Sequence, residues 1–417
     1  MSEVAQVPHS SPDGNIPQLR FPEFGKRWDK ETIGGISKIF GRIGYRGYTV
    51  QDIVSKGEGA IALSPSNFIN NQINTIKSTY ISWFKYEESP EIKILDGDIL
   101  FVKTGSTYGK TAFVSNIKEK ATINPQIVVL KNISISNKFL GYIVTTQTIK
   151  KQIEQIVVGG AIPTMSQKEL SKMEFSLPAK PEQQKIAAFL TAVDSKIEQL
   201  SKKKALLGEY KKGLMQQIFS QAIRFKADDD SEFPDWEERV LGDYLAHKSK
   251  KNKNNEVDLV LSVSNKKGFI TQDEQFDGYQ VASKDLTNYK IVEKGEYAYN
   301  PSRINVGSIA RLKNNTIGIV SPMYVVFKLK NLDSIFFDNL YQTHLFKHLI
   351  KVGCSGSVRD SLNFNDMADF VFSFPSLEEQ AKIVNFLSSI DSKIEQVGKQ
   401  LDESKQFKKA LLQQMFV

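Results

Sequence analysis

The sequence predicts an α+β protein built from two mixed α/β globular units, each followed by one long helix. Three observations predict this fold class. The chain of 417 residues repeats itself at an offset of 197 residues. Residues 179–220 and 376–417 carry apolar side chains at steps of three, four or seven, which is a helical period. Short β-rich runs separated by Gly, Asn and Pro fill the remainder.

The duplication is strongest in the two helical segments. Residues 182–219 and 379–416 are identical at 19 of 38 positions, and DSKIEQ occurs unchanged in both. Between 97–112 and 295–310, in the globular units, only 3 of 16 positions agree. A repeat of this kind indicates one structural unit used twice. The predicted order is a loose tail (1–18), a globular unit (19–178), a helical segment (179–220), a second globular unit (221–375) and a second helical segment (376–417).

Each helical segment predicts one apolar stripe. Proline and acidic residues stand just before or at each start, which suits a helix N-terminus. Each stripe could dock only on its own domain. A heptad-like stripe favours helix-on-helix packing, however, and these stripes are longer than a small domain needs, so we expect the two helices to pair. The predicted interface residues are Ile186, Leu190, Val193, Ile197, Leu200 and Leu207 in the first helix, with Ile383, Leu387, Ile390, Ile394, Val397 and Leu401 in the second.

The globular units show matching runs of predicted strand and helix. Helical stretches are predicted over 137–156 and 334–351. Strand and helix do not alternate regularly enough for a doubly wound sheet. The predicted strands are Asp98–Lys103, Ile127–Leu130, Tyr297–Asn300 and Tyr324–Lys328.

Composition favours a cytoplasmic protein with a polyanionic partner. The net charge is +8, with 40% hydrophobic and 24% charged residues. The one cysteine, Cys354, excludes an internal disulfide framework and suits a reducing compartment. The N-terminus lacks a signal-peptide pattern, and no apolar run reaches 18 residues, so no membrane span is expected.

The stretch KTGSTYGKTA (103–112) is similar to a phosphate-binding P-loop but departs from its pattern. Only three residues separate Gly105 from Gly109, whereas the P-loop has four between its glycines. A P-loop also opens a helix, and the residues after Lys110 read as a strand. The repeat has Ser308 in place of this lysine. We therefore expect a turn that presents polar groups rather than a nucleotide site.

No catalytic or metal centre is predicted. His344 and His348 stand four residues apart on a predicted helix, but no further ligand is spaced to complete a zinc site. What remains are basic loops with glycine, asparagine and aromatic residues at related places in both copies. Such side chains pair with base edges and phosphates of DNA. The candidate DNA-binding residues are Arg42, Tyr45, Arg46, Tyr48, Lys103, Thr104, Ser106, Tyr108, Lys110, Lys250, Lys251, Lys266, Lys267, Asn300, Arg303, Asn305 and Ser308.

A longer pattern occurs twice and carries a family resemblance. GGAIPTMSQKELSKMEFSLPAKPEQQKIAAFLTAVDSKI begins at Gly159, and GSVRDSLNFNDMADFVFSFPSLEEQAKIVNFLSSIDSKI begins at Gly356. Each joins a small turn, a polar step, an apolar stretch ending in Pro, and then Glu-Gln-x-Lys-Ile at the start of a long helix. This sequence resembles the specificity subunit of a type I restriction–modification enzyme from Leu19 onward.

The resemblance implies a function and a set of partners. Each globular unit would be a target-recognition domain that reads half of a bipartite, asymmetric site in double-stranded DNA. The domains would be arranged with pseudo-two-fold symmetry, and the helices would form an antiparallel coiled coil between them that docks two modification subunits. These partners would use S-adenosylmethionine to methylate adenine, and restriction subunits would use ATP and Mg. This chain would bind no cofactor and be non-catalytic. A coiled-coil scaffold and an unfamiliar nuclease or NTPase remain the alternatives.

Overall fold

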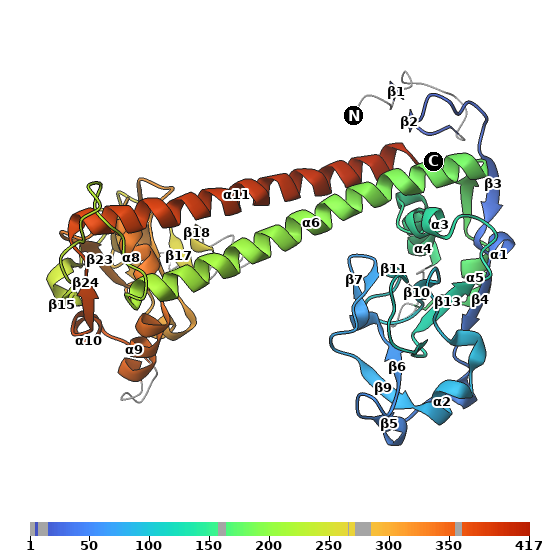
Figure 1. Ribbon diagram of the computed structural model, residues 1–417, viewed down its shortest axis with the longest axis horizontal. Coiled ribbons are helices and arrows are strands. Elements are labelled where there is room, and N and C mark those ends of the chain that lie inside the picture. Colours follow the sequence, from blue (N-terminus) through green and yellow to red (C-terminus); the bar gives the residue numbers. More distant parts are fainter. Residues whose placement is uncertain (1–4, 7–15, 157–163, 266, 272–284, 355–360) are drawn as a thin grey trace. The chain divides into compact units, whose positions relative to one another are not determined.

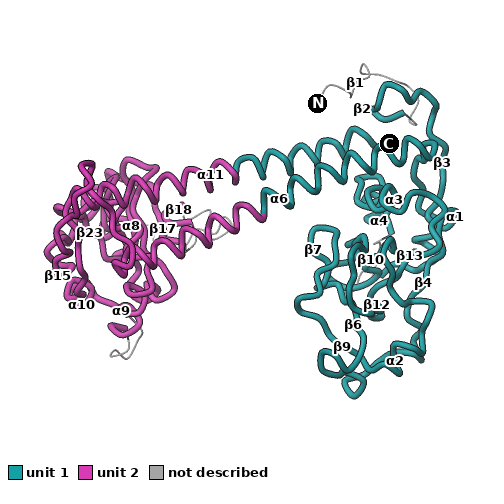
Figure 2. The backbone as a smooth tube through the Cα atoms, viewed as in Figure 1, with its two compact units in different colours: residues 1–201, 399–417 teal, residues 202–398 magenta. Residues whose placement is uncertain are grey.

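The computed structural model describes residues 5–6, 16–156, 164–265, 267–271, 285–354 and 361–417. The chain divides into two compact units (Figures 1 and 2). Unit 1 comprises residues 1–201 and 399–417, and unit 2 comprises residues 202–398. Each unit therefore contains one globular domain, the start of one long helix and the end of the other.

Unit 1 contains a mixed sheet with strand order β4-β13-β10-β11-β8-β7, a second sheet with order β12-β6-β9-β5, and the pair β14-β3. Of the predicted tail, Ala5 and Gln6 pair with β2, and most of the remainder lies outside the described residues. The strands are β1 (Ala5–Gln6), β2 (Leu19–Arg20), β3 (Asp29–Thr32), β4 (Lys38–Gly41), β5 (Ile53–Val54), β6 (Gly59–Leu63), β7 (Phe68–Ile69), β8 (Gln72–Ile73), β9 (Thr79–Ser82), β10 (Ile99–Val102), β11 (Thr111–Phe113), β12 (Ala121–Ile123), β13 (Ile127–Lys131) and β14 (Glu174–Leu177). The short helices are α1 (Ile33–Ile36), α2 (Trp83–Glu87), α3 (Asn137–Ile143), α4 (Gln147–Ile156) and α5 (Gln167–Ser171).

Unit 2 repeats the central part of this layout. Its sheet order β16-β23-β20-β21 corresponds to β4-β13-β10-β11, and the pair β15-β24 corresponds to β3-β14. The strands are β15 (Glu237–Val240), β16 (Leu245–Lys248), β17 (Leu261–Ser264), β18 (Gly268–Thr271), β19 (Lys290–Glu293), β20 (Tyr297–Tyr299), β21 (Ile309–Arg311), β22 (Ile317–Val320), β23 (Val325–Leu329) and β24 (Val371–Phe374). The short helices are α8 (Ser334–Leu340), α9 (His344–Cys354) and α10 (Phe364–Ala368).

The predicted fold class is confirmed, with one local correction. The four predicted strands form close to their expected ends, as β10, β13, β20 and β23. The predicted helices over 137–156 and 334–351 are wrong as single helices, because each is broken in the middle into α3/α4 and α8/α9. At each break a buried threonine, Thr146 or Thr343, donates its hydroxyl to the carbonyl oxygen three residues earlier, at 2.7 Å. This bond closes the first helix of each pair.

The long helices are α6 (Lys180–Phe219) and α11 (Leu377–Gln414). In unit 1, Ile186 and Leu190 at the start of α6 share one core with Leu411, just before the end of α11, and with Met415. In unit 2, Met215 and Ile218 near the end of α6 share a core with Ile383 and Leu387 near the start of α11. The start of one helix therefore lies beside the end of the other in both units, which is antiparallel pairing.

Matched ion pairs join the helices within each unit. Lys408 contacts Asp194 at 2.6 Å in unit 1, and Lys211 contacts Asp391 at 2.8 Å in unit 2. Both lysines and both aspartates are related by the 197-residue offset. Leu200 and Leu401 are 5% and 6% exposed without belonging to the core cluster of the globular domain. The apolar stripe thus serves both expected purposes, since its ends dock on the domains and its inner residues pack between helices.

The predicted interface residues differ in their burial. Val193, Ile197, Leu207 and Ile394 are half-buried. The remaining predicted residues are buried, namely Ile186, Leu190, Leu200, Ile383, Leu387, Ile390, Val397 and Leu401.

An arginine–glutamate ion pair fixes the start of each long helix to its own domain. In unit 1, Arg20 donates to both carboxylate oxygens of Glu182, at 2.7 and 2.8 Å, and both residues are buried. The next residue, Gln183, donates to the carbonyl oxygen of Pro178 and accepts from the backbone N–H of Ser136. These bonds tie the helix, the preceding strand and the domain together.

Unit 2 repeats the anchor. Arg224 donates to both oxygens of Glu379 at 2.9 Å, and Gln380 donates to the carbonyl oxygen of Pro375. The Glu-Gln dipeptide at the start of each helix is therefore the feature that orients each domain on its helix.

Candidate nucleic-acid interface

The turn that looked like a P-loop joins two strands. Residues 103–110 connect β10 to β11, and the strand β11 follows where a P-loop would open a helix. Gly109 has φ of +78° and donates its N–H to the carbonyl oxygen of Val102 at 3.0 Å. Gly307 occupies the same position in unit 2, with φ of +94°. Because this left-handed conformation favours glycine, the two identical glycines fix the turn in both copies.

The predicted residues of this turn point in different directions. Ser106 and Lys110 are exposed, whereas Lys103, Thr104 and Tyr108 are half-buried. The Thr104 hydroxyl lies 2.9 Å from that of Thr164, and the carbonyl oxygen of Lys103 accepts from Met165. Burial raises the pKa of Tyr108, with a further contribution from Glu169, so its phenol remains protonated at neutral pH.

The loop after β4 divides into inward and outward residues. Arg42 is buried and donates to the carbonyl oxygen of Ile123 at 2.9 Å and the hydroxyl of Thr122 at 3.0 Å. Its assignment as a DNA-binding residue is therefore corrected, because its guanidinium holds the loop in place. Tyr48 is half-buried, and burial raises its pKa. Tyr45 is 80% exposed and carries the guanidinium of Arg46 over its ring, with 5.6 Å to the centroid.

Unit 2 requires two similar corrections. Asn300 is buried, and Ser308 is buried with its hydroxyl donating to the carbonyl oxygen of Val263 at 2.9 Å. Both side chains shape the β20–β21 turn rather than project from it. Arg303 and Asn305, in the same turn, are exposed as predicted.

The predicted lysines of unit 2 lie in two places. Lys250 and Lys251 are exposed, and they contact Glu293 at 3.6 Å and Asn288 at 3.1 Å respectively. Lys267 is exposed in the β17–β18 hairpin. Lys266 lies outside the described residues.

Each unit has a hollow at the same place in its fold. The hollow lies where the strand–strand turn meets the break between the two short helices, and each is bordered by a hairpin, β7–β8 in unit 1 and β17–β18 in unit 2. The unit 1 hollow has a volume of about 650 Å³ and is lined by Asn71, Tyr108, Gly109, Lys110, Thr111, Val144, Thr145, Lys150, Ile153 and Glu154. The unit 2 hollow has a volume of about 500 Å³ and is lined by Ser264, Asn265, Gly268, Ile304, Asn305, Val306, Gly307, Ile309, Ala310, Tyr341, Gln342, Lys347 and Ile350.

The two hollows share a frame and differ in the groups they present. Offsets of 197 or 198 residues relate Gly109 to Gly307, Lys150 to Lys347 and Ile153 to Ile350, with identical residues each time. The remaining related positions differ, namely Tyr108/Val306, Lys110/Ser308, Thr111/Ile309, Val144/Tyr341, Thr145/Gln342 and Glu154/Lys351. The two hollows therefore share one backbone arrangement but present different side-chain groups.

Several residues of these hollows were missed by sequence reasoning. They are Thr145 and Lys150 in unit 1, and Gln342 and Lys347 in unit 2. A signal was present, because aligning residues 144–154 with 341–351 places the two lysines, the two threonines of the helix breaks and an isoleucine at identical positions. Because residues 137–156 and 334–351 were each predicted as one continuous helix, the exposed corner at each helix break, where these side chains lie, was not predicted.

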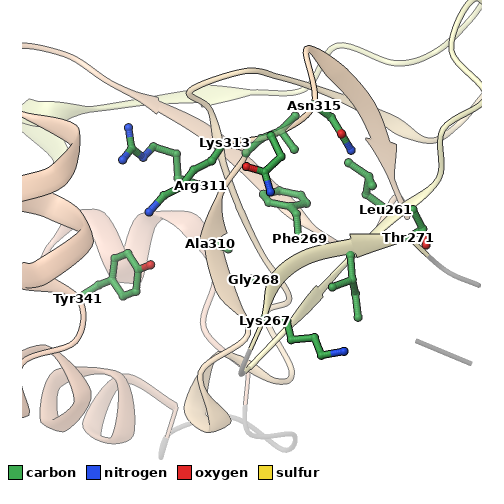
Figure 3. Close-up of a pocket in the computed structure, with 13 residues that line it drawn as sticks. Leu261, Lys267, Gly268, Phe269, Thr271, Ala310, Arg311, Lys313, Asn315 and Tyr341 are labelled. Atoms are coloured by element: carbon green, nitrogen blue, oxygen red, sulfur yellow. The ribbon is translucent and has the colours of Figure 1, made fainter. Parts of the chain in front are cut away.

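A neighbouring hollow in unit 2, of about 430 Å³, lies on the other side of β18 and β21. Figure 3 shows it with Tyr341, which directly follows α8, at one side and Thr271 at the other. Three cationic side chains line it, and two of them, Arg311 and Lys313, contact the carboxylate of Asp338 at 2.8 and 2.9 Å. Lys150 and Lys347 differ from these cations: among the described residues, neither ammonium lies within ion-pair distance of an acidic side chain.

Each long helix also presents an aromatic side chain to solvent. Tyr210 of α6 is 56% exposed, and Phe407 of α11 is 48% exposed. These positions are related by the 197-residue offset, and each directly precedes a lysine of the matched ion pairs. Within the part of the chain that the structure describes, no cluster of His, Cys, Asp and Glu suits a metal, and no helix is long and apolar enough to cross a membrane.

Residues 26–208 and 234–403 both match the family model of the type I restriction modification DNA specificity domain. The chain belongs to this family. Two specificity subunits of Methanocaldococcus jannaschii are similar along most of their length. The putative type I restriction enzyme MjaX specificity subunit is 24% identical over 380 residues, which cover 82% of this chain and 83% of the relative. The MjaVIII specificity subunit is 23% identical over 346 residues, covering 77% and 79%.

A solved structure shows the same fold. The crystal structure of the type I restriction–modification S subunit from M. genitalium aligns with a TM-score of 0.56 at 16% identity, covering 96% of this chain and 99% of that chain. The specificity-subunit fold expected from the two copies of the Glu-Gln helix start is therefore confirmed. The two ranges matched by the family model correspond to the two copies of the repeat.

Proposed function

We propose that this chain is the DNA-sequence-specificity subunit of a type I restriction–modification system, and that each unit reads one half of a bipartite, asymmetric site in double-stranded DNA. One observation carries the proposal. The same hollow occurs in both domains with an identical Gly, Lys and Ile, while the surrounding side chains differ. Shared groups suit contacts that are the same for any sequence, such as phosphates, and differing groups suit base edges.

The long helices are proposed to dock two modification subunits and, through them, the restriction subunits. Half of the compared helix positions are identical, as expected if both helices meet copies of one partner. The exposed Tyr210 and Phe407 are suitable anchors at equivalent places, because aromatic residues are enriched at the centres of protein interfaces.

The chain itself is proposed to be non-catalytic and to bind no cofactor. S-adenosylmethionine, ATP and Mg would be bound by the partner subunits, which would act in the cytoplasm with this chain. An NTPase is disfavoured by the β10–β11 turn, which is followed by a strand and lacks the lysine in its second copy. A scaffold without DNA contact is disfavoured by Lys150 and Lys347, which form no ion pair with any described residue.

Selection of DNA by the assembled complex tests the proposal. The chain is purified with its modification subunits and incubated with a duplex library that has a randomised central segment. The proposal predicts enrichment of two short defined sequences separated by an undefined gap of fixed length. Equal recovery of all sequences would contradict it, and so would an undiminished affinity when the salt concentration is raised.

A further inference from the structure

We propose that Lys150 and Lys347 are matched contacts to DNA backbone phosphates in the two half-sites, and that Gln342 reads a base edge in the half-site of unit 2. This assignment rests on the proposed function and gives individual residues their roles within it.

The position of the lysines supports a phosphate contact. Lys150 lies in the first turn of α4, and Lys347 lies at the same place in α9. Both side chains are exposed on the border of their hollow. A group that is identical in both domains cannot account for a difference between the sequences they read. Among the described residues neither ammonium forms an ion pair, and an exposed, unpaired ammonium is well suited to neutralise a phosphate in DNA of any sequence.

The differing residues are the ones able to distinguish bases. Thr145 is half-buried, and its hydroxyl is donated to the carbonyl oxygen of Tyr142 at 2.7 Å, so it faces its own helix. Gln342 is exposed and donates one amide N–H to the carbonyl oxygen of Asp338 at 2.8 Å. Its amide oxygen and second N–H remain available. These are the acceptor and donor with which Gln pairs to the N6 and N7 positions of adenine.

Asn305 strengthens this reading of the unit 2 hollow. It is exposed and lines the same hollow from the β20–β21 turn. The unit 2 hollow therefore offers three carboxamides, those of Asn265, Asn305 and Gln342, whereas the β10–β11 turn at the border of the unit 1 hollow offers the ammonium of Lys110 and the phenol of Tyr108. We infer that unit 2 prefers a half-site containing adenine at the base pair that faces Gln342.

The experiment uses the complex of the full chain with its modification subunits. Its target duplex is first selected from the randomised library, and affinity is then measured by fluorescence anisotropy at several salt concentrations. The test variants are Lys150→Ala, Lys347→Ala, Gln342→Ala and Gln342→Glu. The controls are Lys30→Ala on β3 and Lys328→Ala on β23, two exposed lysines outside the hollows. Circular dichroism and co-purification establish that each variant folds and assembles.

Each lysine variant is expected to weaken binding to every duplex by a similar factor and to lower the salt slope by about 0.9. The loss relative to wild type should then shrink by about 3-fold to 4-fold between 50 and 200 mM salt, because one released counterion contributes that factor. Gln342→Ala should reduce discrimination at one base pair by about 5-fold to 150-fold. Gln342→Glu should move the preference there from adenine toward cytosine, whose N4 group donates to a carboxylate.

The outcomes separate the two levels of the proposal. A library that yields no bipartite sequence would contradict the proposed function itself. If a bipartite sequence is selected, lysine variants that match the controls in salt slope would overturn the phosphate assignment. Lysine variants that alter the selected sequence would overturn it too. Unchanged base preference in both Gln342 variants would overturn the reading role of that residue.

Discussion

The buried ion pair between Arg20 and Glu182 makes the structure quantitatively testable. In the intact protein Glu182 is 2% exposed, and replacing Arg20 with Ala removes the two hydrogen bonds that its carboxylate accepts at 2.7 and 2.8 Å. Among the described residues, the Glu182 carboxylate accepts no side-chain hydrogen bond other than these two. Removing one member of a buried ion pair costs about 3–5 kcal/mol. We expect this loss at the start of α6.

Unit 2 provides a matched comparison. Glu379 is fully buried and accepts from Arg224, but it also accepts from the indole N–H of Trp236 at 2.9 Å. After Arg224→Ala one hydrogen bond to the carboxylate remains. A hydrogen bond to a charged group contributes about 1.5–3 kcal/mol, so Arg224→Ala should cost less than Arg20→Ala by that amount. Adding Trp236→Phe removes the remaining donor and should abolish the difference.

Hydrogen exchange measures the two sites separately within one molecule, which is needed because two compact units need not unfold together. Peptides covering 180–193 report on unit 1, and peptides covering 377–390 report on unit 2. A loss of 3–5 kcal/mol corresponds to exchange about 100-fold to 4000-fold faster. Exchange at 180–193 should accelerate in Arg20→Ala while 377–390 serves as the internal control. Equal, small effects of both arginine variants would refute the reasoning.

Three further perturbations test other parts of the structure. Leu200→Asp places a charge at a position that is 5% exposed between the helices, so co-purification with modification subunits should fall while both domains stay folded. Ala205→Asp, at an exposed position of the same helix, is the control. Normal assembly of Leu200→Asp would count against the helix pair. Gly109→Ala places a Cβ on a backbone with φ of +78°, and this Cβ would lie 3.0 Å from the Ile153 side chain. The variant should lower the free energy of unfolding of unit 1 by about 1–2 kcal/mol, measured by hydrogen exchange. Gly44→Ala, whose added Cβ would meet open space, should change it little. Inserting one heptad into each long helix adds about 10 Å at 1.5 Å per residue, which should lengthen the unread gap in the selected DNA by about three base pairs. A gap of constant length would show that the helices do not set the spacing.

The sequence predicted the frame of this protein better than its surface. The helix periods and the repeat located α6 and α11 to within a few residues, because a long apolar stripe has few alternative conformations. The breaks at Thr146 and Thr343 were missed, since a threonine is compatible with a helix interior and only its bond to the earlier carbonyl oxygen ends the helix.

The direction of polar side chains was harder to predict. Arg42, Asn300 and Ser308 stand in polar loops but turn inward to satisfy buried backbone or side-chain groups, or to fill space beneath the turn. Asn305 occurs in a similar local sequence and remains exposed, whereas Arg46 is half-buried and contacts Glu91 at 3.6 Å. Only the three-dimensional partners distinguish these cases. The resemblance in the Glu-Gln helix start, in contrast, identified the family, because Glu182 and Glu379 anchor the domains in the same way in both units.

The most direct test of the central claim is a map of methylated adenines in DNA from cells that express this chain with its modification subunits. Two dissimilar reading domains predict that every methylated adenine lies in one motif, composed of two different short sequences separated by a gap of constant length. A continuous motif without an unread gap, or two identical halves, would contradict the account.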